Sequence, residues 1–122
     1  MKILSSTGLV CGITIVAALA LGMPAYSDMD AGKATFKESC VHCHGEEGAG
    51  NPVQDKFWRM RIPRLNEAYV QKKSDAELKN IILNGKRKMP AAMMGNPETA
   101  HRTKVQPEQV ADLIAYVRSL KK

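Results

Sequence analysis

The sequence predicts an all-α fold, and three observations lead to that prediction. No segment alternates between apolar and polar residues as a half-buried strand would. Apolar residues recur at helical spacing in two places, after Ser74 and after Pro107. The length of 122 residues allows one domain, and 44% hydrophobic residues with mixed charge exclude a disordered chain. The 5% of aromatic residues make a large self-sufficient core doubtful.

The first half of the chain predicts two helices separated by a long loop. Asp28 or Asp30 can cap the first helix, which runs through Phe36 to a cysteine-rich segment. Residues 45–64 contain three glycines and two prolines, which are typical of a loop. A short helix is expected at residues 66–72.

The second half predicts two amphipathic helices joined by another loop. Ser74 and Glu77 form a capping box, and the apolar residues that follow at helical spacing end at Gly85. Residues 86–106 contain two prolines and a glycine and are expected to be a loop. Pro107 opens the last helix, where its missing N–H costs nothing. One face of this helix is apolar: Val110, Leu113, Ile114, Val117 and Leu120.

The N-terminus has the pattern of a secretory signal peptide. Lys2 precedes the apolar run 8–23, and small residues occupy the −3 and −1 positions of a cut after Ser27. A retained anchor is the alternative, although the run is near the lower length limit for a membrane span. Cys11 lies too early in the run for lipidation. We therefore expect residues 1–27 to be removed, and residues 28–122 to form the mature domain in the periplasm.

The two cysteines of the mature chain belong to one motif. Cys40-Val41-His42-Cys43-His44 has the C-x-x-C-H spacing of c-type haem attachment. On a helix, Cys40, Cys43 and His44 share one face, so both thiols can form thioethers with the haem while the imidazole reaches the iron. A redox dithiol would need a βαβ pattern, and a zinc site would need two further well-spaced ligands. The sequence offers neither, and it therefore predicts one covalently bound haem c.

This motif, the later Met89-Pro90 pair and the amphipathic C-terminal helix together resemble a known family. Over nearly its whole mature length, the chain is similar to the class I small monohaem cytochromes c. The resemblance implies three to five helices wrapped around one haem and a methionine as the second axial ligand. Met89 matches the ligand loop of the family. Met93 and Met94 are alternatives, because the stretch 95–106 is long and polar for the loop that follows a ligand.

Other positions carry weaker expectations. Gly32 and Phe36 resemble the small and aromatic pair of the family's first helix, and Tyr116 resembles its partner on the last helix. Pro63 resembles the proline whose carbonyl receives the N–H of the haem-ligating histidine ring, although it also suits a simple turn. Four residues are candidate donors to the haem propionates: Trp58, Arg59, Arg61 and Arg64.

The charge of the chain indicates the kind of partner. The net charge is +6, and Lys86, Arg87 and Lys88 stand directly before Met89. Basic charge near a haem edge favours transient docking of redox proteins with acidic surfaces. Nucleic acid is not an expected partner after export. We expect a monomer that reaches membranes only through partner complexes.

These features predict a soluble periplasmic electron carrier and not an enzyme, since an iron with both axial positions filled has no site for substrate. A subunit of a larger redox complex would use the same chemistry. A peroxidase-like protein would need an open sixth position and a polar distal group, for which His101 is the candidate. We also expect the protein without haem to be largely unfolded, because its core is small.

Overall fold

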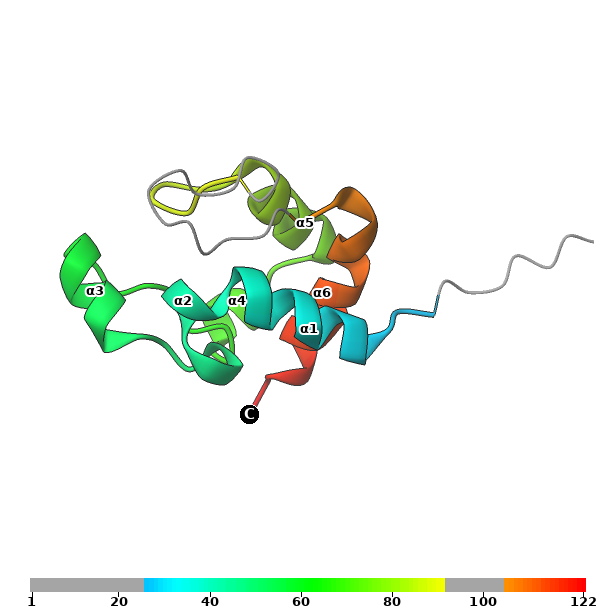
Figure 1. Ribbon diagram of the computed structural model, residues 1–122, viewed down its shortest axis with the longest axis horizontal. Coiled ribbons are helices and arrows are strands. Elements are labelled where there is room, and N and C mark those ends of the chain that lie inside the picture. The colour runs from blue at the N-terminus through cyan, green and yellow to red at the C-terminus, as the bar shows by residue number, and fades with distance from the viewer. Residues whose placement is uncertain (1–25, 92–104) are drawn as a thin grey trace, which may run out of the picture.

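The computed structural model describes residues 26–91 and 105–122, which form an all-helical domain (Figure 1). The longer helices are α1 (Met29–Ser39), α3 (Pro52–Trp58), α5 (Asp75–Asn84) and α6 (Val110–Ser119). Single turns connect them: α2 (Val41–His44), α4 (Ala68–Gln71) and the 3₁₀ turns η1 (Glu46–Gly48) and η3 (Pro107–Gln109). The prediction of an all-α domain is confirmed. In the described part, no helix is long and apolar enough to span a bilayer.

The helix boundaries follow the caps that the sequence contains. The carboxylate of Asp28, and not that of Asp30, begins α1 by accepting the backbone N–H groups of Asp30 and Ala31. Ser74 and Glu77 exchange side-chain and backbone hydrogen bonds at the start of α5, which ends at Gly85. The first helix and the capped helix are therefore confirmed.

Helix α3 corrects one prediction, because it lies within the segment expected to be a loop. Asn51 caps this helix by accepting the backbone N–H groups of Val53 and Gln54 at 3.1 and 3.4 Å. Pro52 occupies the first turn of the helix, where a backbone N–H would have no partner within the helix and its absence therefore costs nothing. Pro52, which in the sequence suggests the end of a helix, therefore starts one.

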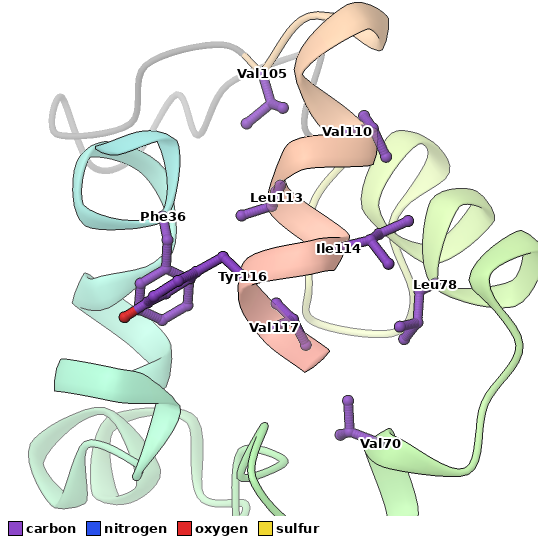
Figure 2. Packing of buried hydrophobic residues seen from close by; sticks show 9 residues of the cluster. All are labelled: Phe36, Val70, Leu78, Val105, Val110, Leu113, Ile114, Tyr116 and Val117. Atoms are coloured by element: carbon purple, nitrogen blue, oxygen red, sulfur yellow. The ribbon is translucent and has the colours of Figure 1, made fainter. Parts of the chain in front are cut away.

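The centre of the fold is the crossing of α1 and α6. A Cβ atom built on Gly32 would lie 2.0 Å from the carbonyl oxygen of Asp112, so only glycine permits this approach. Figure 2 shows Phe36 and Tyr116 meeting between the two helices, with ring centroids 5.3 Å apart. The close contact that the sequence predicts for these three residues is therefore present.

Helix α6 also holds α4 and α5 in place. Val70 from α4 and Leu78 from α5 belong to the same buried cluster as the apolar face of α6 (Figure 2). The Gln71 side chain donates from Nε2 to the carbonyl oxygen of Val117 at 2.8 Å. Arg118 donates to the carbonyl of Gln71 at 2.9 Å and pairs with Asp75. These contacts fix the elements that line the cavity described next.

Candidate functional site

The cysteine-rich segment forms one turn of helix directly after α1. The backbone N–H groups of Cys43 and His44 both donate to the carbonyl of Cys40, at 3.2 and 3.0 Å. This turn carries the three side chains on adjacent positions of one helical face. Both cysteines are half-buried and His44 is buried.

A cavity of about 560 Å³ opens beside this turn. Its volume lies within the range of ~300–1,000 Å³ that is usual for sites of small molecules and cofactors. Leucine, isoleucine and valine side chains of α5 and α6 form its apolar wall: Leu78, Ile81, Ile82, Leu113, Ile114 and Val117. The described residues that the sequence singles out for haem binding line this cavity, with the exception of Arg59: Cys40, Cys43, His44, Trp58, Arg61, Pro63, Arg64 and Met89.

The ring of His44 is held in one tautomer. Its Nδ1 atom lies 3.1 Å from the carbonyl oxygen of Pro63. A carbonyl oxygen can only accept, so Nδ1 carries the proton and, in the neutral ring, Nε2 carries the lone pair. This is the tautomer that a metal-ligating histidine needs, with its second nitrogen donating to a carbonyl. The contact expected of Pro63 from the family resemblance is present in the structure.

Met89 lies in a tight turn that follows the end of α5 at Gly85. The backbone groups of Lys86 and Met89 exchange two hydrogen bonds, both of 2.9 Å, and Arg87 has a φ of 55° at the tip. In Figure 1 this turn, drawn in yellow, lies across from α2, and residues of both segments line the cavity. Met93, Met94 and His101 lie outside the described residues, so the choice among the methionines stays a prediction.

Trp58 is the last residue of α3, and it lines the cavity. Its ring packs against Phe57 in an edge-to-face arrangement, with centroids 4.9 Å apart. The ammonium group of Lys88 lies 5.9 Å from the centre of the Trp58 ring. This contact links α3 to the turn that carries Met89.

Arg64 is engaged with Asp55, a residue that the sequence analysis did not single out. The guanidinium forms a two-pronged ion pair, with Nη2 at 2.5 Å from Oδ2 and Nη1 at 3.0 Å from Oδ1 of Asp55. These hydrogen bonds from Arg64, followed by the one from the backbone N–H of Ile62, lower the pKa of Asp55 to about 2. The hydrogen bonds of Arg64 in this structure are therefore to the protein itself, to Asp55 and to the carbonyl of Ile62. Its role toward a haem propionate stays a prediction.

The other two arginines proposed as propionate donors differ from Arg64. Arg61 lines the cavity, but its guanidinium forms an ion pair with Glu67. Arg59 is exposed at the end of α3 and is not among the residues that line the cavity. Among the charged residues of 26–91 and 105–122 that line the cavity, one is acidic and six are basic: Arg61, Arg64, Lys73, Lys86, Arg87 and Lys88.

The residues present fit a covalently held haem. Two cysteines and a histidine from one turn line a cavity that also has an apolar wall, as a flat macrocycle requires. A zinc site has no comparable support, since residues 26–91 and 105–122 contain no cluster of three or more His, Cys, Asp or Glu placed to bind an ion. The all-helical fold and this site together place the protein in the class of c-type haem proteins.

Comparison with known proteins agrees with this class. The chain belongs to the cytochrome c family, because its residues 29–121 match the family model described as Cytochrome c. Membership implies haem-based electron transfer and a covalent haem c, with which the spacing of Cys40 and Cys43 is consistent. Proteins of this family are typically electron carriers rather than enzymes.

One solved structure shows the likeness in three dimensions. The chain is similar to the KustC0563 c-type cytochrome, with 25% sequence identity and a TM-score of 0.58. The similarity covers 75% of this chain and 98% of that chain. No curated protein sequence matches the chain.

Proposed function

We propose that this protein is a soluble periplasmic electron carrier that exchanges single electrons with other redox proteins. Family membership supports haem-based electron transfer. The observation that carries the proposal is the cavity, which joins Cys40, Cys43 and His44 on one side to Met89 on the other. When bound there, a haem supplies an iron that cycles between the ferrous and ferric states.

Each residue of the site has a defined task in this proposal. The Cys40 and Cys43 thiols would tether the haem, and His44 would bind its iron through Nε2. Met89 would supply a thioether ligand to the iron, and such a ligand raises the reduction potential. With His44 and Met89 both bound to the iron, no position would remain for a substrate, which is the reason for proposing a carrier.

Exposed basic residues at the cavity support the proposal that partners dock transiently. Lys86, Arg87 and Lys88 are exposed and lie on the turn next to Met89. A basic surface speeds encounter with an acidic redox protein without requiring tight binding. We propose that the protein is a monomer, and that it contacts membranes only through such partners. Residues 1–27 are proposed to direct export and to be removed.

The axial ligand provides the direct test. Oxidised wild-type protein should be low-spin and show the weak sulfur-to-iron absorption band, and Met89→Ala should lose this band. Met60→Ala is the matched control, because Met60 is also half-buried and lines the same cavity. Loss of the band in Met93→Ala or Met94→Ala instead would assign the ligand to that residue. A high-spin oxidised wild type would contradict the proposed carrier.

A further inference from the structure

One carboxylate binds the residues on both sides of Pro63, through the backbone of Ile62 and the side chain of Arg64. Asp55 Oδ1 accepts the backbone N–H of Ile62 at 2.8 Å and Nη1 of Arg64 at 3.0 Å, while its Oδ2 accepts Nη2 of Arg64 at 2.5 Å. Arg64 Nη1 also donates to the carbonyl oxygen of Ile62 at 2.7 Å. The residues before and after Pro63 are therefore both tied to Asp55. We call this arrangement the Asp55 clamp.

The clamp also packs against Gly50, in the loop that follows the turn carrying His44. A Cβ atom on Gly50 would lie 2.1 Å from Nε of Arg64, so glycine leaves the space that the guanidinium occupies. The backbone N–H of Gly50 donates to the carbonyl of His44 at 2.7 Å. Arg64 is therefore enclosed between Asp55 and a loop that is bonded to His44 itself.

Pro63 depends on this support. The Pro63 carbonyl belongs to the peptide unit that Pro63 shares with Arg64, and proline has no backbone N–H of its own through which residue 63 could be held. Its neighbours Ile62 and Arg64 determine the direction of that carbonyl, which accepts Nδ1–H of His44 at 3.1 Å. Such outer hydrogen bonds orient a ligating histidine and increase its electron donation.

We propose that Asp55 is a positioning residue, which holds the Pro63 carbonyl against His44 and thereby lowers the reduction potential of the bound haem. The inference rests on the proposed function, because it requires His44 to be the axial ligand. Asp55 itself is on α3, and it acts through Ile62, Pro63 and Arg64. With a pKa of about 2, its carboxylate is ionised at neutral pH.

The test compares two variants that remove one negative charge near the same cavity. Asp55→Asn weakens the clamp. Glu67→Gln is the matched control, because Glu67 lines the cavity and pairs with Arg61, whereas Asp55 pairs with the residues flanking Pro63. A purely electrostatic effect of the lost charge would therefore appear in both variants.

Two readouts are measured on the haem-loaded protein. In Asp55→Asn, we expect the His44 ring N–H to exchange with solvent about tenfold faster by NMR, which corresponds to the loss of about one hydrogen bond. In Glu67→Gln this rate should equal that of the wild type. The midpoint potential of Asp55→Asn should be more positive than that of Glu67→Gln. Should Asp55→Asn fail to fold, Arg64→Lys weakens the clamp without a change of charge, because one ammonium cannot bridge both oxygens of Asp55, and Arg61→Lys is then the matched control.

The outcomes separate the two proposals. An unchanged exchange rate in Asp55→Asn, or equal potential shifts in Asp55→Asn and Glu67→Gln, overturns the positioning role alone. Retention of the wild-type low-spin spectrum by His44→Ala overturns the ligand assignment and the positioning role together. Faster exchange with a larger potential shift in Asp55→Asn supports the Asp55 clamp.

Discussion

Replacing Gly32 by alanine should destabilise the protein, although the same change in most helices is stabilising. In an exposed helix interior, alanine is favoured over glycine by about 1 kcal/mol. At Gly32 the new Cβ would lie 2.0 Å from the Asp112 carbonyl oxygen, where ordinary contacts begin at 3.4 Å. The obstacle is backbone, so no side-chain rotation relieves it and α1 must move away from α6. Overpacking of this kind costs about 1–3 kcal/mol, or more. We expect a net loss of about 2 kcal/mol after the gain in helix propensity.

The assay is denaturant unfolding of the haem-loaded protein, followed by far-UV circular dichroism. Ala34→Gly is the control, because Ala34 is exposed on the same helix and its replacement reports helix propensity alone. It should lose about 1 kcal/mol. A Gly32→Ala protein as stable as the wild type, or more stable, would refute the close-contact argument at the α1–α6 crossing.

Three further predictions concern the cavity, its basic surface and Asp55. A protein carrying Cys40→Ala and Cys43→Ala and lacking haem should show little helix by circular dichroism, because the apolar wall of the cavity then has no packing partner. A full helical spectrum would contradict this. The rate of electron transfer to an acidic redox protein should fall steeply as salt shortens the Debye length, while reduction by a small neutral reagent should not, and a flat salt response would exclude steering. The folded pKa of Asp55 is about 2, against 3.8 for an unperturbed group, so its contribution to stability is complete above about pH 4 and is lost as the pH falls through about 2. The difference in unfolding free energy between wild type and Asp55→Asn should therefore shrink between about pH 4 and pH 2, and a constant difference would contradict it.

The parts of the fold that the sequence predicted were those with local signals. The capping box at Ser74 and Glu77 contains both ends of its own hydrogen bonds, so α5 could be located without any knowledge of its neighbours. Pro107 and the apolar periodicity after it located α6 in the same way. The spacing of Cys40, Cys43 and His44 also depends only on one turn of helix.

The features that the sequence did not predict depend on where a residue lies within its helix, or on contacts between residues that no local pattern connects. Pro52 breaks a helix in its interior and starts one at its first turn, and only the Asn51 cap decides between these roles. Asp55 and Arg64 are nine residues apart with no periodic pattern between them, so nothing local identifies their ion pair. Their contact exists only because α3 folds back toward the segment that carries Pro63.

The central claim is that a haem in this cavity has both axial positions filled and serves only to carry electrons. The most direct measurement is the optical spectrum of the reduced protein before and after addition of carbon monoxide, taken together with a redox titration. We predict a reversible one-electron titration, and a reduced spectrum that carbon monoxide leaves unchanged. Rapid formation of a carbon monoxide complex would show an open sixth position and would contradict the account.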